Sequence, residues 1–218
     1  MKACIFDLDG TLADTLESMS ISANQVIEPL GYAPLPTENF RYYAGDGAKT
    51  LVERVLRDAG DKNLVHLEEV YQAYCEIFDR DCTYKVVVFD GMKEILKKLK
   101  AMGVKLAVFS NKPHAQTRKV ISNLFGDNLF DWVQGQQDGN EKKPDPSGAL
   151  KIAEIFEVRP EECMYIGDTN VDMMTGNRAG MFTVGVLWGF RDRKELMDNH
   201  AHALAEKPED LIRLYIEK

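Results

Sequence analysis

Cysteine is scarce in this sequence, and the four that occur among 218 residues are scattered. None forms a C-x-x-C pair or lies beside a histidine cluster, which argues against a zinc site or a disulfide scaffold. Long apolar runs are also missing, since no stretch approaches the roughly 18 residues of a membrane-spanning helix. Asp7 follows Met1 too closely for a signal peptide. Together these absences predict a cytoplasmic protein with reduced thiols.

Positive charge is in deficit as well. Lysine and arginine number 27 against 35 aspartates and glutamates, which gives a formal net charge of -8. A surface of that sign repels nucleic acid and anionic membranes, so neither is an expected partner. A small anionic molecule held at a local basic patch remains compatible with this charge. No feature of the sequence indicates an oligomeric state.

Short apolar runs predict the strands of a sheet. They lie at Ala3–Phe6, Val104–Phe109, Met164–Ile166 and Thr183–Val186, with a weaker run near Phe130–Val133. Helical patterns separate them, and the clearest is an apolar stripe that stops at Gly103 and consists of Met92, Ile95, Leu96, Leu99 and Met102. Strands that alternate with helices predict an α/β fold, a doubly wound, Rossmann-like parallel sheet.

One region breaks this alternation. Residues 16–84 show helical periodicity without a convincing strand, and the sheet-like pattern returns near Lys85–Gly91. We therefore predict a core domain formed by residues 1–15 and 85–218, with residues 16–84 as an inserted helical domain. The chain crosses twice between the core domain and the insert, and this connection suits a lid that opens and closes.

The first predicted strand runs directly into an acidic motif, Asp7-Leu8-Asp9-Gly10-Thr11. Because side chains alternate along a strand, Asp7 and Asp9 lie on one side and Leu8 faces the core. The carboxyl end of a strand is also where open α/β sheets bind ligands. An acidic, solvated turn is the alternative interpretation of this motif on its own.

Three further segments carry polar side chains, two at predicted strand ends and one just before a predicted helix. They are Ser110-Asn111-Lys112, Gly167-Asp168-Thr169-Asn170-Val171-Asp172 and Lys142-Lys143-Pro144. Each has an ordinary explanation as a helix cap or a solvated loop. Together they place a hydroxyl, a cation and two further acids on the rim that holds Asp7 and Asp9. This coincidence indicates a reactive site.

The four segments resemble, in order, the motifs of the haloacid dehalogenase-like hydrolase superfamily, whose phosphatases carry D-x-D-G-T, S/T-N, K-P and G-D-x-x-x-D. The helical insert falls where that superfamily has its helical cap domain. Within the superfamily, the sequence is similar to the phosphoglycolate phosphatase-type group. That likeness is carried by three segments: Tyr43–Gly47 followed by Leu51 and Arg54, Ser110–Pro113, and Val186–Arg191.

The resemblance implies a magnesium-dependent phosphatase that acts on a small phosphorylated metabolite. Asp7 would attack phosphorus and form an aspartyl-phosphate. Asp9 would protonate the leaving alcohol and then take a proton from water. Crowded carboxylates repel one another without a cation, and oxygen ligands favour Mg²⁺. The implied metal ligands are Asp7, the backbone carbonyl of Asp9, Asp168 and, close by, Asp172.

The substrate contacts that the resemblance implies come from both parts of the chain. The phosphate would be bound by Thr11, Ser110, the amide of Asn111 and Lys143, and Lys143 would also hold Asp7. If the substrate carries a carboxylate, the cap must supply a cation for it. Lys49 and Arg54, which follow a glycine-rich loop, are the candidates. The alternative is that both are solvated charges on a helix.

Three functions remain open from the sequence. The first is hydrolysis of a small phosphomonoester, for which 2-phosphoglycolate is one candidate. The second is a sugar phosphomutase of the β-phosphoglucomutase kind, which shares the nucleophile and the metal but keeps the phosphate on sugar. The third is a catalytically silent binding protein with the same fold. The intact set of Asp7, Asp9, Lys143 and Asp168 favours an enzyme.

Overall fold

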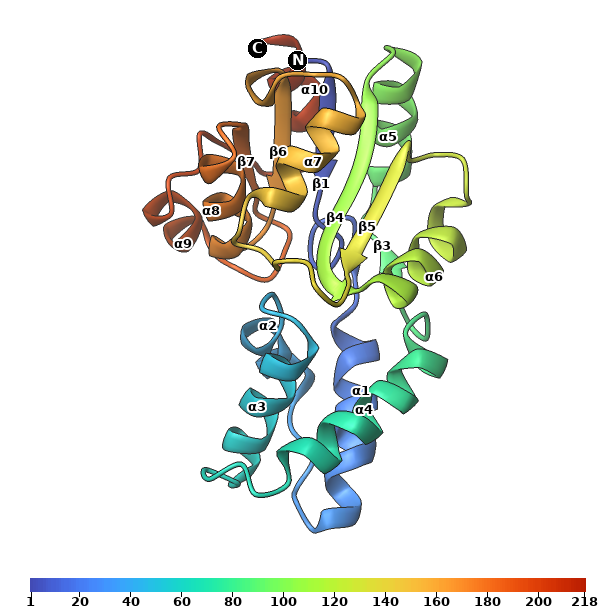
Figure 1. Cartoon of the computed structure of the whole chain (residues 1–218), viewed down its shortest axis with the longest axis vertical. Helices are drawn as coiled ribbons and strands as arrows, with labels where there is room; N and C mark the ends of the chain where they lie inside the picture. Colours follow the sequence, from blue (N-terminus) through green and yellow to red (C-terminus); the bar gives the residue numbers. More distant parts are fainter.

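The computed structural model describes residues 1–218 and contains a six-stranded parallel sheet in the order β5-β4-β1-β6-β7-β8 (Figure 1). The central strand β1 pairs on one side with β4 and on the other with β6. The strands are β1 (Ala3–Phe6), β4 (Lys105–Pro113), β5 (Trp132–Gln136), β6 (Cys163–Gly167), β7 (Phe182–Val186) and β8 (Ala203–Ala205). The predicted doubly wound α/β core is therefore confirmed.

Helices cover both faces of the sheet, because alternate side chains of each buried strand pack in opposite directions. Ala3 and Ile5 of β1 belong to an apolar cluster that includes residues of α7. Cys4 and Phe6 belong to a larger cluster that includes residues of α5, α6 and α10. The core helices are α5 (Met92–Ala101), α6 (His114–Phe125), α7 (Ser147–Ile155), α8 (Asn170–Arg178), α9 (Arg193–Asp198) and α10 (Asp210–Ile216), and Pro160–Glu162 forms the 3-10 turn η3.

The remaining helices form a group at one end of the molecule, beyond the carboxyl ends of β1 and β4 (Figure 1). They are α1 (Leu16–Ile27), α2 (Phe40–Tyr43), α3 (Ala48–Ala59) and α4 (Leu67–Asp81), with the 3-10 turns η1 (Glu28–Leu30) and η2 (Thr37–Asn39). The helices predicted in this region are thus present. Their apolar side chains, such as Phe40, Leu56 and Tyr74, are buried in the same large cluster as one face of the sheet. We refer to α1–α4 as the cap.

Some elements depart from the sequence-based expectation. Strand β4 continues to Pro113, beyond the predicted end at Phe109, because it pairs with β5 again after a register shift. The chain passes between core and cap through a short antiparallel pair, β2 (Ala13–Asp14) and β3 (Val87–Val88), which the sequence did not indicate. Edge strand β8 was also missed. Across the whole chain, no helix combines the length and the apolar character needed to span a membrane.

Candidate active site

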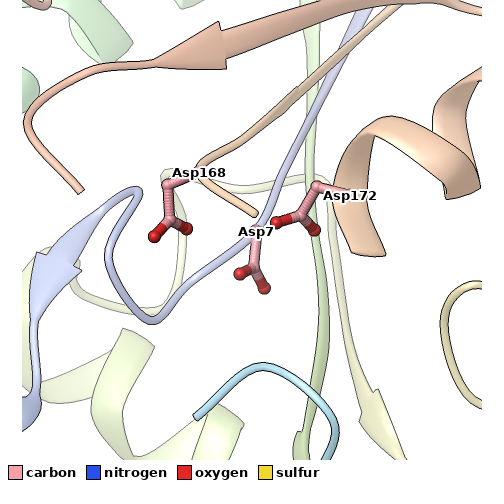
Figure 2. Close-up of side chains that lie close together, drawn as sticks. All are labelled: Asp7, Asp168 and Asp172. Atoms are coloured by element: carbon pink, nitrogen blue, oxygen red, sulfur yellow. The ribbon is translucent and has the colours of Figure 1, made fainter. Parts of the chain in front are cut away.

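The carboxyl ends of neighbouring strands bring three acidic side chains together. Asp7 follows β1 and Asp168 follows β6, and the two strands are paired through Phe6 and Ile166. Asp172 lies in the first turn of α8, just after Asp168. Ligand atoms of the three carboxylates all lie within 4.8 Å of one another, and Figure 2 shows them converging on one space. The predicted clustering of these acids is therefore observed.

Lys143 is the counter-ion of this acidic cluster. Its Nζ lies 2.8 Å from Asp7 Oδ1 and 2.7 Å from Asp172 Oδ1, and its side chain is only 2% exposed. It donates a hydrogen bond to Asp172. The contact with Asp7 is an ion pair at short range, because Asp7 Oδ1 accepts no directed hydrogen bond. This buried oxygen is thus held near a cation without a hydrogen bond of its own.

The cluster carries an excess of negative charge. Asp7, Asp168 and Asp172 face a single ammonium, that of Lys143, which leaves two formal negative charges in a buried site. Burial raises the pKa of Asp7 to about 7, although Lys143 opposes this rise. Burial and the neighbouring Asp172 also hold the pKa of Asp168 well above its ordinary value. Burial acts to lower the pKa of Lys143, but Asp172 and Asp7 outweigh it and hold that pKa well above its usual range.

Asp168 is fixed by donors from two other segments. It accepts hydrogen bonds from Thr11 Oγ1 at 2.9 Å and from the Phe190 N–H at 2.8 Å. The turn that carries Thr11 approaches so closely that a Cβ on Gly10, whose φ is 85°, would lie 2.3 Å from Asp168 Oδ2. Only glycine fits there. The Thr11 hydroxyl therefore positions Asp168 in this structure, and its phosphate contact stays a prediction.

Asp9 lies two residues beyond Asp7 and contacts a lysine that the sequence analysis did not single out as a site residue. Lys112 Nζ donates a 2.6 Å hydrogen bond to Asp9 Oδ1. The same ammonium lies 4.8 Å from the centre of the Phe78 ring, which belongs to cap helix α4. The only signal in the sequence was its place directly after Ser110-Asn111. The extension of β4 past Phe109 brings it into the site.

Ser110 and Asn111 lie at the same end of β4 and both border the cavity described below. Ser110 Oγ accepts a hydrogen bond from the Lys112 N–H. The side-chain amide of Asn111 donates to the carbonyls of Gly45 and Lys143 at 2.9 and 3.0 Å. Both of its side-chain hydrogens are therefore occupied, and the Asn111 side chain ties the core to the cap. The phosphate contacts of Ser110 and Asn111 stay predictions.

A cavity separates this acidic cluster from the cap, with a volume of about 430 Å³ when its open mouth is included. The core contributes Asp7, Asp9, Ser110, Asn111, Lys112, Pro113 and Lys143 to its lining. The cap contributes apolar side chains and glycines, namely Met19, Ala44, Gly45, Gly47, Ala48, Leu51, Tyr74 and Phe78. The charged groups of this cavity thus come from the core alone.

Core side chains donate hydrogen bonds to backbone carbonyls of the cap loop that covers this cavity. Lys142 Nζ donates to the carbonyl of Asp46 at 2.8 Å. Arg191 donates to the carbonyl of Ala44 at 3.1 Å and also to that of Arg41. With the bond from Asn111 to Gly45, these contacts fasten the loop over the site.

Lys49 and Arg54 do not line the cavity. Lys49 Nζ lies 2.6 Å from Glu68 on the cap surface. Arg54 pairs with Asp46 and donates to the carbonyls of Tyr42 and Tyr43. The structure therefore gives both cations other partners, and their role in substrate binding stays a prediction without a supporting contact.

Comparison with known proteins decides the family. Residues 4–186 match the sequence profile of the haloacid dehalogenase-like hydrolases. The chain belongs to this family. Residues 4–186 include Asp7, Ser110, Lys143 and Asp168, so the resemblance read from the four motifs is confirmed.

Relatives of this haloacid dehalogenase-like hydrolase carry a common name. A phosphoglycolate phosphatase from Aquifex aeolicus is 32% identical over 218 residues, covering 98% of this chain and 96% of the relative. A phosphoglycolate phosphatase from Psychrobacter arcticus is 32% identical over 191 residues, covering 85% and 83% of the two chains. A crystal structure from Lactobacillus delbrueckii subsp. bulgaricus, provisionally assigned to the same activity, superposes with a TM-score of 0.91 at 29% identity and covers 98% of each chain.

Proposed function

We propose that this protein is a magnesium-dependent phosphatase that hydrolyses a small phosphomonoester through an aspartyl-phosphate on Asp7. One observation carries the proposal: Asp7 borders the cavity with a lysine at 2.8 Å and a second acid, Asp9, two residues away. This set supplies a nucleophile, a cation and a proton donor at one end of the sheet. The names of the relatives support 2-phosphoglycolate as the substrate.

The acidic cluster fits a divalent cation. Its two uncompensated formal charges match one Mg²⁺, and carboxylate oxygens are the ligands this ion prefers. We propose that Asp7, Asp168 and the backbone carbonyl of Asp9 hold the ion, with Asp172 adjacent. When bound, the metal would neutralise charge on the transferring phosphoryl group.

The remaining chemistry belongs to the side chains of the chain itself. An Asp7 oxygen forms a bond to phosphorus while the bond between phosphorus and the ester oxygen breaks. Asp9, protonated at the start, gives its proton to that oxygen, so the product leaves as a neutral alcohol. Asp9 then accepts a proton from water as the water oxygen attacks the aspartyl-phosphate, which releases phosphate and restores both acids. Lys143 balances the charge of Asp7 and of the phosphoryl oxygens throughout.

The two alternative functions have less support. A sugar phosphomutase must bind a second phosphate, whereas the cap presents no charged side chain to this cavity. A silent binding protein has no physical need for a buried nucleophile, acid and lysine together.

The proposal also places the protein in the cytoplasm, and the four unpaired cysteines support this location.

The proposed function is tested by measuring inorganic phosphate released from a panel of phosphorylated metabolites. We expect sustained release in the presence of Mg²⁺, none with excess chelator, and 2-phosphoglycolate among the best substrates. If phosphate stays on sugar in bisphosphate-dependent isomerisation, the mutase assignment is correct instead. If no member of the panel is hydrolysed, the protein is not a small-molecule phosphatase.

The buried acids predict how metal binding depends on pH. An acid whose pKa is higher in the folded than in the unfolded chain binds its proton more tightly when folded. For Asp7, the free energy of unfolding of the metal-free protein therefore falls as pH rises from about 4 toward 7. The raised pKa of Asp168 also makes this free energy of unfolding fall as pH rises. Burial lowers the pKa of His114, so this side chain makes the free energy of unfolding rise with pH near its unfolded pKa. His114 does not belong to the acidic cluster.

We therefore expect Mg²⁺ to raise the melting temperature more at about pH 8 than at about pH 5. The difference should reach several degrees, since about 1 kcal/mol moves the Tm of a domain of this size by about 2–4 °C. Thermal unfolding with Mg²⁺ and with EDTA at both pH values measures it. Asp168→Asn is the matched control and should reduce the effect. A Tm increase that is the same at both pH values would contradict the assigned metal site.

A further inference from the structure

Lys112 is a buried ammonium with incomplete pairing. Its side chain is 3% exposed, and its only hydrogen-bond acceptor is Asp9 at 2.6 Å. The face of the Phe78 ring, at 4.8 Å, adds a weaker attraction to the charge. An ammonium has three donors, and Asp9 is the only protein acceptor that this one contacts. A buried cation in this state is suited to receive an anion.

Lys112 is also the only cation left for a second anionic group of a substrate. The residues that line the cavity include two lysines, Lys112 and Lys143. Lys143 already contacts Asp7 and Asp172 and lies where the phosphoryl group must bind. A second anionic group on the substrate therefore meets Lys112.

The cap surrounds Lys112 with apolar surface rather than with charge. Phe78, Tyr74, Leu51 and Met19 face the same cavity, and each is less than 7% exposed. Apolar walls lower the local dielectric constant and strengthen an ion pair between ammonium and carboxylate. They also leave little room for a long or strongly hydrated leaving group.

We propose that Lys112 determines specificity by binding the carboxylate of a phosphomonoester whose carboxylate is attached to the carbon bearing the ester oxygen. The inference rests on the proposed phosphatase function. Asp9 must reach the ester oxygen to protonate it, and Lys112 contacts that same Asp9 carboxylate. The Lys112 ammonium is therefore within about two hydrogen-bond lengths of the ester oxygen. In 2-phosphoglycolate, a single carbon separates that oxygen from the carboxylate, which suits this spacing.

The test compares two esters of equal length on the full chain with Mg²⁺. One is 2-phosphoglycolate, and the other is 2-hydroxyethyl phosphate, which replaces the carboxylate by a neutral alcohol. The wild-type protein should favour 2-phosphoglycolate in kcat/KM by about 10²–10³-fold, as expected for a charge-assisted contact in a buried site. Lys112→Met should lose about that factor on 2-phosphoglycolate and less than about tenfold on the neutral ester.

Two further variants sharpen the comparison. Lys97→Met replaces an exposed lysine on α5 and should leave the ratio of the two kcat/KM values unchanged. Lys49→Met tests the rival idea that the cap supplies the cation, and we expect the ratio to be kept. A loss of preference in Lys49→Met that is absent from Lys112→Met overturns the proposal.

The outcomes separate this inference from the proposed function. If wild-type protein hydrolyses both esters equally well, the phosphatase stands and the role of Lys112 is wrong, whether or not Lys112→Met folds. An equal loss on both esters in Lys112→Met shows that Lys112 acts only by positioning Asp9, which also overturns the proposal. If the wild-type protein hydrolyses neither ester but releases phosphate from another member of the metabolite panel, the phosphatase stands and the role of Lys112 is wrong. If it hydrolyses no member of the panel, both claims fail.

Discussion

Asp7→Asn is expected to abolish turnover while the fold is kept. Asparagine has the same shape as aspartate, but its amide lacks the negative oxygen that attacks phosphorus. Loss of a group that works as part of a catalytic set commonly costs about 10⁴-fold or more in kcat. Steady-state phosphate release on the best substrate measures this loss. A variant that keeps more than about a tenth of the wild-type kcat would remove Asp7 from the nucleophile role.

Stability separates this catalytic effect from unfolding. Asp7 is one of three clustered buried carboxylates, of which Lys143 pairs with Asp7 and Asp172, so removing the charge of Asp7 relieves repulsion when no metal is bound. We therefore expect the Tm of Asp7→Asn in EDTA to equal or exceed that of the wild-type protein. Asp127→Asn, at an exposed loop position, is the matched control and should keep full activity.

Asp9→Asn is expected to lower kcat by about 10²–10⁴-fold, the usual contribution of general acid–base catalysis. The variant keeps its backbone carbonyl, so the response of its Tm to Mg²⁺ should persist. The proton needed by the leaving alcohol is then missing. Esters of acidic alcohols, such as p-nitrophenyl phosphate, should lose less kcat/KM than alkyl esters because their leaving groups need no proton.

The ratio of the two losses is the decisive readout for Asp9. Hydrolysis of the aspartyl-phosphate, in which Asp9 acts as the base, is common to all esters, so the losses are compared in kcat/KM, which reports only the steps up to phosphoryl transfer. A similar loss of kcat/KM on alkyl and p-nitrophenyl esters would indicate that Asp9 acts in that transfer by holding Lys112 or the metal rather than by protonating the leaving group. A kcat within a few-fold of wild type on alkyl esters would exclude the acid–base role altogether.

The clustering of Asp7, Asp9 and Asp168 could be predicted because parallel strands direct their carboxyl ends to one edge of the sheet. Lys143 lies in the loop before α7, and only the family resemblance implied its place beside Asp7. The periodicity of strands and helices predicted which residues lie at those strand ends. Thr11 shows the limit of such reasoning: its position in the motif was clear, but its hydroxyl points to Asp168. Periodicity locates a residue on an element and does not determine where its side-chain donor points.

The side-chain positions of the cap lysine Lys49 and of Lys112 could not be predicted for a similar reason. Lys49 follows a glycine-rich loop that does border the cavity, since Gly45, Gly47 and Ala48 all line it. The rotation of α3 turns the Lys49 side chain toward Glu68 instead. This rotation depends on packing between α3 and α4, which the apolar pattern of one helix does not encode. The reach of Lys112 into the cavity depends likewise on the extension of β4, which its pairing with β5 decides.

Trapping the phosphoryl group on the protein tests the central claim most directly. Wild-type protein turning over its best substrate with Mg²⁺ is quenched and treated with borohydride, which reduces an acyl phosphate to an alcohol. Peptide mass spectrometry then locates the modified residue. We predict homoserine in place of Asp7, and none in samples that lack substrate or contain Asp7→Asn. Reduction at another residue, or no reduction despite rapid turnover, would contradict an aspartyl-phosphate on Asp7.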